Sequence, residues 1–307
     1  MARSGAISAN RPLRRHRWTI AQHQLLGREW AHSRSQQCRK PARLRVGGHP
    51  AQIAQFTRVC WWDRAGVGWS DLGPYPRTSQ ANAKDLHALL QASGIAPPYV
   101  LVGYSAGGHD VRVYHGLYPD EVAGVVLVDA AHEEEGERVG PWGRGRRIPR
   151  WLWYPNDLIA RMLAETGVLR LMHSKDEVTS PGPGWSHEQS DILSHLQRRP
   201  EAVAAGVSSG GSVVNDRLAH ESGGLGNKPL IVLTAGKAHP APLQFAKEVA
   251  AYQDVWKYEL QPKLARLSTR GRQVIVENAS HAMPFEVPEV VVGAVKQVVE
   301  EVRGRQD

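Results

Sequence analysis

Short apolar runs alternate with amphipathic stretches along most of the chain after residue 50. The runs Phe56–Trp62, Tyr99–Gly103 and Val122–Val128 are apolar and contain several β-branched residues, a pattern that predicts buried strands. Thr78–Ala92 and Val111–Tyr118 instead repeat apolar positions three and four residues apart, as amphipathic helices do. Strands that alternate with helices form a parallel sheet with right-handed crossovers. The pattern therefore predicts an α/β fold with helices on both faces of a mostly parallel sheet.

The same alternation returns after residue 226. Pro229–Thr234 and Gln273–Glu277 are further predicted strands, and the valine-rich segment Val287–Val302 predicts a terminal helix with Pro288 in its first turn. Residues 132–225 interrupt the pattern with charged and glycine-rich stretches and then helical ones, which indicates an inserted helical cap. We therefore expect three parts: a core of residues 51–131 and 226–307, a cap of residues 132–225, and an irregular, basic segment of residues 1–50.

The first fifty residues carry the positive charge of this protein. The whole chain has a formal net charge of +8 at pH 7. Residues 1–50 hold 11 Lys and Arg but one acid, Glu29, a net of +10, whereas residues 51–307 hold 27 basic and 29 acidic groups. Three interpretations of the basic segment stay open: a disordered arm, an organelle transit peptide, or a start that replaces the native one.

This distribution of charge argues against nucleic acid as a partner, because a nucleic-acid-binding domain has its basic face on the folded body. No run of 18 apolar residues occurs, so we expect no integral membrane association. The two cysteines, Cys38 and Cys60, fit neither a disulfide framework nor a zinc site, and we interpret Cys60 as a buried small hydrophobe. We expect a cytoplasmic protein without a metal or cofactor.

One motif joins a predicted strand to a predicted helix. Gly103-Tyr104-Ser105-Ala106-Gly107 matches G-x-S-x-G, in which a serine sits on a sharp turn that exposes its hydroxyl above the edge of the sheet. The two glycines avoid side chains that would crowd the neighbouring strand and helix. The strand before the motif and the helix after it give the context that the motif requires. We therefore predict that Ser105 is a nucleophile.

A serine hydroxyl needs a base to remove its proton, and the base needs a third group to orient it. Of the 14 histidines, His281 directly follows the last predicted strand, at the sheet edge where the serine is expected, so we predict that it is the base. The loop after Pro229–Thr234 contains no carboxylate. Asp129 ends the strand that follows the serine along the chain and is our predicted acid, with Glu133 and Asp254 as fallbacks.

Four stretches together resemble the α/β-hydrolase superfamily, and specifically its capped serine hydrolases. They are Asp63–Ser70, Gly103–Gly107, Leu127–Asp129 and Asn278–His281. The resemblance extends over residues 55–131 and 226–300. It implies the α/β-hydrolase fold and a cofactor-free hydrolase of esters, amides or related acyl compounds. Ser105 stands where dehalogenase relatives have an aspartate, which argues against dehalogenase chemistry.

One departure from the superfamily pattern concerns the oxyanion hole, the backbone N–H groups that bind the negative charge developing on the substrate. The resemblance implies that Ala106 supplies the first N–H and a glycine-rich loop near the amino terminus the second. Gly48 is the candidate for the second, but only 14 residues separate it from Trp62, which leaves little room for the usual central strand. We therefore expect residues 1–50 to lack this strand and the hole to be incomplete.

These observations predict a serine hydrolase that cleaves a small-molecule ester or related acyl substrate, with activity weakened by the incomplete hole. Tyr104, next to the nucleophile, and Trp153, in the cap, are the predicted substrate-binding residues. One alternative is a catalytically impaired, hydrolase-like binding protein. Another is a protein that docks on anionic surfaces through residues 1–50. No feature of the sequence predicts an oligomeric state.

Overall fold

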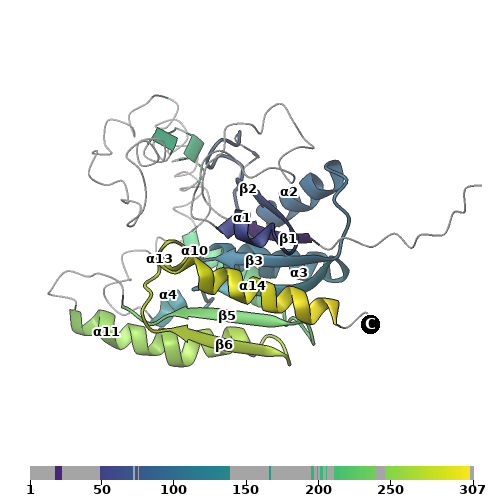
Figure 1. The fold of residues 1–307 in the computed structure, drawn as a ribbon. Coiled ribbons are helices and arrows are strands. Elements are labelled where there is room, and N and C mark those ends of the chain that lie inside the picture. Colours follow the sequence, from purple (N-terminus) through teal and green to yellow (C-terminus); the bar gives the residue numbers. More distant parts are fainter. Residues whose placement is uncertain are drawn as a thin grey trace, which may run out of the picture.

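The fold is a parallel sheet with helices on both faces, shown by a computed structural model (Figure 1). The structure describes residues 18–22, 49–71, 73–74, 76–138, 166, 195–196, 199, 201–202, 205, 211–238 and 246–304. Within these residues, six strands form one sheet in the order β2-β1-β3-β4-β5-β6, and every neighbouring pair is parallel. The strands are β1 (Trp18–Gln22), β2 (Arg58–Trp62), β3 (Tyr99–Tyr104), β4 (Val122–Val128), β5 (Leu230–Ala235) and β6 (Gly271–Val276). The predicted parallel sheet is confirmed.

β1 contradicts the sequence analysis. It lies between β2 and β3 and pairs with both, with Gln22 opposite Trp62 on one side and Gly103 on the other. The expectation that residues 1–50 lack a central strand is therefore wrong, and this segment is not irregular throughout. Five residues of mixed polarity give a weak local signal, whereas the unpaired edges of two neighbouring strands supply the hydrogen-bonding partners for the segment.

Helices cover both faces of the sheet. α1 (His49–Ile53) and α14 (Pro288–Arg303) lie on one face, where α14 crosses in front of the strands in Figure 1. α2 (Ser79–Ala92) and α3 (Gly107–Leu117) lie on the other. The remaining helical elements are η1 (Pro119–Glu121), α4 (Glu135–Arg138), α10 (Gly211–Glu221), α11 (Ala246–Val255), η6 (Trp256–Leu260), α12 (Gln261–Ala265) and α13 (Met283–Glu286).

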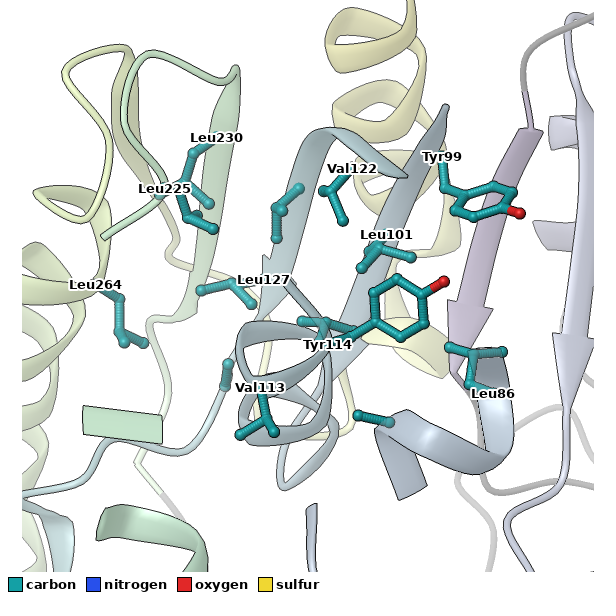
Figure 2. Close-up of a cluster of buried hydrophobic side chains, with 14 of the residues drawn as sticks. Leu86, Tyr99, Leu101, Val113, Tyr114, Val122, Leu127, Leu225, Leu230 and Leu264 are labelled. Atoms are coloured by element: carbon teal, nitrogen blue, oxygen red, sulfur yellow. The ribbon is translucent and has the colours of Figure 1, made fainter. Parts of the chain in front are cut away.

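Two apolar cores follow from the alternation of side chains along each strand. In β3, Tyr99 and Leu101 face α2 and α3, while Val100 and Val102 face α14. Figure 2 shows the first core, in which Tyr114 of α3 packs among side chains from the sheet. A strand in this position has no polar face, so its sequence is continuously apolar.

The far end of the predicted cap packs on the core. α10 contacts α2 and α3, and the side chain of Asn215 accepts a hydrogen bond from the backbone N–H of Ser79, at the start of α2. Arg112 of α3 donates to the carbonyl of Ala219 in α10. Most of residues 139–210 lie outside the described residues, so the cap stays a prediction. Among the residues that the structure describes, no helix is long and apolar enough to cross a membrane.

Cys60 differs from our interpretation. It is buried in the core, but it is disulfide-bonded, and the described residues contain no free cysteine. The sequence holds one other cysteine, Cys38, outside the described residues. The spacing of two cysteines in a sequence says little about whether the folded chain brings them together, because a disulfide requires Cα atoms within about 7 Å.

Candidate active site

Ser105 occupies the sharp turn between β3 and α3. Its φ angle of 52° lies in the left-handed region, which few residues other than glycine adopt. Gly103 allows this turn, because a Cβ atom there would lie 2.6 Å from the carbonyl oxygen of Gly107. The backbone of Ser105 also bonds to the neighbouring strand end, with its N–H donating to Val128 and its carbonyl accepting from Ala131. The loops after β3 and β4 therefore hold each other in place.

The structure brings Ser105, His281 and Asp129 into one hydrogen-bonded row. The Oγ atom of Ser105 lies 3.0 Å from Nε2 of His281, and Nδ1 of His281 lies 2.6 Å from Oδ2 of Asp129. The three side chains come from the loops after β3, β4 and β6, which all end at the carboxyl edge of the parallel sheet. Residues separated by 152 and 176 positions meet because parallel strands end at the same edge.

Asp129 is an ionised carboxylate in a buried position. Burial alone would raise its pKa, but the hydrogen bond and charge of His281 and the N–H donors of Ala235 and Trp256 hold the pKa below its ordinary value. An ionised carboxylate only accepts hydrogen bonds, so Nδ1 of His281 carries the proton between them. Nε2 of the neutral ring is then an acceptor and faces the hydroxyl of Ser105. This arrangement suits removal of the serine proton.

Tyr104 contacts His281 through both its hydroxyl and its ring. Its hydroxyl donates to the backbone carbonyl of His281 over 2.8 Å, and the two rings stack with centroids 5.0 Å apart. Burial and the negative charge of Asp129 raise the pKa of Tyr104 above its ordinary value, so the phenol stays protonated as a donor. The predicted role of Tyr104 in substrate binding stays a prediction.

The other predicted site residues have different positions. Ala106 is exposed and directly precedes α3. Backbone N–H groups at the start of a helix have no acceptor within the helix, so they are free to bind an oxyanion. Gly48 and Trp153 lie outside the described residues.

The two fallback acids lie elsewhere. Glu133 accepts two hydrogen bonds from the guanidinium of Arg112, and although burial opposes its ionisation, this pairing lowers its pKa to about 2. Asp254 is exposed on α11. The structure therefore places Asp129, and neither fallback, against His281.

Comparison with known proteins agrees with this fold. The family model described as "alpha/beta hydrolase fold" matches residues 54–147, which hold the serine turn and the acid. The chain has the α/β-hydrolase fold. It is 15% identical to the solved enol-lactonase from Burkholderia xenovorans LB400, with a TM-score of 0.55 over 93% of this chain and 91% of that one. The fold supports a hydrolase.

Curated relatives extend the comparison. An "AB hydrolase superfamily protein" of Gibberella zeae is 23% identical over 80% of this chain and 79% of its own length. A "Probable transporter" of Hormonema carpetanum, efuK, is 26% identical over 81% of this chain. The matched region is 36% of that relative's length, so this chain corresponds to about a third of it.

Two polar contacts near Asp129, the predicted acid, were not predicted from the sequence. The indole Nε1 of Trp256 donates to Oδ1 of Asp129 over 2.8 Å, and Nε2 of Gln261 donates to the carbonyl of Ala130 over 2.8 Å. Both residues belong to a helical segment more than 120 positions downstream of the acid. No motif marks them, because a tryptophan and a glutamine in a helix usually serve packing and solvation. Across the residues with described placement, no cluster of three or more His, Cys, Asp or Glu side chains suits a metal ion.

Proposed function

We propose that the protein is a serine hydrolase of ester or related acyl substrates that acts through Ser105, His281 and Asp129. The observation that carries the proposal is the unbroken row of hydrogen-bond distances, 3.0 Å and 2.6 Å, from the hydroxyl to the buried carboxylate. One protein with the same fold is an enol-lactonase, so the fold accommodates cleavage of a cyclic ester.

The reaction would pass through a covalent acyl intermediate. The Oγ atom of Ser105 attacks the carbonyl carbon of the substrate while its proton moves to Nε2 of His281. The oxygen that gains negative charge accepts the N–H of Ala106. The tetrahedral intermediate then collapses as the leaving group takes the proton from His281. A water molecule, deprotonated by the same nitrogen, releases the acid and restores the serine.

The catalytically impaired binding protein is the second candidate. It depended on an incomplete oxyanion hole, which we inferred from a missing central strand, and β1 occupies that strand position. Gly48, the candidate for the second N–H of the hole, lies outside the described residues. The hydrogen-bond distances from Ser105 through His281 to Asp129 support an active site. We therefore favour the active hydrolase.

A fluorophosphonate probe tests the proposal. The probe phosphorylates an activated serine, so we expect mass spectrometry to find the label on Ser105 and Ser105→Ala to remain unlabelled. The matched control is Ser70→Ala, which removes a hydroxyl that donates to the backbone carbonyl of Asp63 in another loop. Labelling of another residue, or equal labelling of Ser105→Ala, would contradict the proposed nucleophile. A folded wild-type protein without label would favour the impaired binding protein.

A further inference from the structure

Trp256 points its indole N–H at the predicted triad acid. Nε1 lies 2.8 Å from Oδ1 of Asp129, and the backbone N–H of Ala235 donates to the same oxygen over 2.9 Å. The other oxygen, Oδ2, faces His281. Trp256 and Asp129 are 7% and 2% exposed, so water does not compete for these bonds. Both oxygens are thus engaged, which fixes the rotation of the carboxylate.

An irregular turn of helix places Trp256 there. η6 is a π-helix, and the backbone N–H of Gln261 donates to the carbonyl of Trp256, five residues earlier. In an α-helix, side chains five residues apart point about 140° away from each other. A bond from residue i to i+5 widens the turn and brings them toward the same side. Trp256 and Gln261 can therefore reach adjacent residues, Asp129 and Ala130.

Gln253, almost a turn before Trp256, completes the contact. Its Nε2 atom donates to the carbonyl of Ala235 over 2.9 Å. Gln253, Trp256 and Gln261 are all buried, and we call them the acid clamp. Trp256 and Gln261 donate to the two residues that follow β4, and Gln253 donates to the last residue of β5. The clamp thus fixes the carboxylate and the backbone on both sides of it.

The backbone of Asp129 needs such support. Its φ angle of 40° lies in the left-handed region, where a residue other than glycine costs of order 1–3 kcal/mol unless its surroundings hold it. Ser105 shows the same feature in the adjoining loop. A strained loop without external bonds would relax and turn the carboxylate away from the histidine.

We propose that Trp256 is a positioning residue of the triad, whose indole N–H holds the carboxylate of Asp129 so that Oδ2 faces His281. The proposal rests on the proposed serine hydrolase function. Trp256 touches neither the serine nor the attacked carbonyl, so its effect passes through the acid. A hydrogen bond from a neutral donor to a buried carboxylate is charge-assisted and therefore among the stronger ones.

Two replacements of Trp256 test the proposal. Benzothienylalanine, incorporated at position 256, replaces the indole N–H by sulfur and keeps the shape of the ring, while Trp256→Phe removes the donor genetically. We expect both to lower kcat on a chromogenic ester by about tenfold or more with little change in KM, because small misplacement of a reacting group costs up to about 10²-fold. The matched control is Tyr258→Phe, at an exposed ring of the same turn, and should keep wild-type kcat.

A nuclear magnetic resonance measurement supplies a second readout that does not depend on turnover. The proton on Nδ1 of His281 gives a downfield signal when it is held by a carboxylate, so the signal should move in both replacements and stay in Tyr258→Phe. Wild-type kcat together with an unmoved signal in the benzothienylalanine protein would overturn the proposal. If the wild-type protein does not label at Ser105, the hydrolase function fails, yet the signal still shows whether Trp256 positions the acid.

Discussion

Asp63 and Asp129 are two buried aspartates in equivalent places, and their pKa values are shifted in opposite directions. Each directly follows a parallel strand, β2 or β4, at the same edge of the sheet, and they are 7% and 2% exposed. Burial raises the pKa of Asp63 to about 6, although the Trp69 N–H and the charge of Arg199 oppose the rise. The pKa of Asp129 is instead below its ordinary value. Position and burial therefore do not decide the direction of the pKa shift of these carboxyl groups.

The donors around each carboxyl explain the difference. Asp129 meets the indole of Trp256, the backbone N–H of Ala235 and the ring of His281. Asp63 accepts one backbone N–H, from Trp69, on Oδ2, and its Oδ1 atom has no partner among the described residues. A buried carboxylate without donors lowers its cost by taking up a proton. The pKa of Asp63 is therefore raised, whereas that of Asp129 is held low, which favours the negative charge that an orienting acid requires.

The largest expected effect separates the two aspartates by activity. Asp129→Asn should lower kcat on a chromogenic ester by about 10⁴-fold, because the amide favours the wrong tautomer of His281. Asp63→Asn is the matched control and should stay within a few-fold of wild type, with both melting temperatures measured to show folding. An active Asp129→Asn, or a larger loss in Glu133→Gln or Asp254→Asn, would show that our acid is wrong.

The next prediction compares the aspartates by stability. The pKa of Asp63 in the folded protein is about 6, above its ordinary value of 3.8. The folded protein therefore keeps this proton up to a higher pH than the unfolded chain does. Stability due to this group is then greatest below pH 4 and falls as the pH rises from about 4 to about 6. Relative to Asp63→Asn, the wild type should lose about 3 kcal/mol across this window.

Denaturant unfolding of both proteins from pH 3 to pH 7 measures this difference. The difference between the two free energies of unfolding isolates Asp63, because the other groups titrate in both proteins. A difference that stays constant with pH would contradict the raised pKa. If the wild type instead gained stability relative to Asp63→Asn as the pH rises, the pKa of Asp63 would be lowered, as that of Asp129 is.

The smallest expected effect concerns a donor one step further from the acid. Tyr104→Phe removes the hydroxyl that donates to the His281 carbonyl but keeps the stacked ring. A single neutral hydrogen bond contributes about 1 kcal/mol, so we expect a loss of kcat of roughly fivefold. Steady-state kinetics measures it, with Tyr258→Phe as control. A loss as large as that of Asp129→Asn would mean that Tyr104 does more than hold the loop.

Much of the fold follows from local pattern. The apolar runs that predict β3 and β4 coincide with the observed strands to within one residue, since a strand covered on both faces must be apolar throughout. The helix predicted over Thr78–Ala92 is α2, with the Thr78 side chain accepting from the N–H of Ala81 as its cap. The spacing of glycines around Ser105 likewise follows from a local steric demand.

Other features depend on residues far apart in the sequence. β1 exists because two neighbouring strands offer it hydrogen bonds. The opposite pKa shifts of Asp63 and Asp129 arise from burial in the folded core and, at Asp129, from donors more than 100 residues away in the sequence.

The sequence by itself thus determined the alternation of strands and helices, the serine turn and the three residues expected to work together. Local sterics and hydrophobic periodicity act within a few residues, so they can be recognised in the sequence. Only the tertiary structure decided that Trp256 faces the Asp129 carboxylate and that the pKa of Asp63 is raised. Hydrogen bonds and desolvation depend on which atoms meet in space, and a π-helical turn more than 120 residues away supplies one of them.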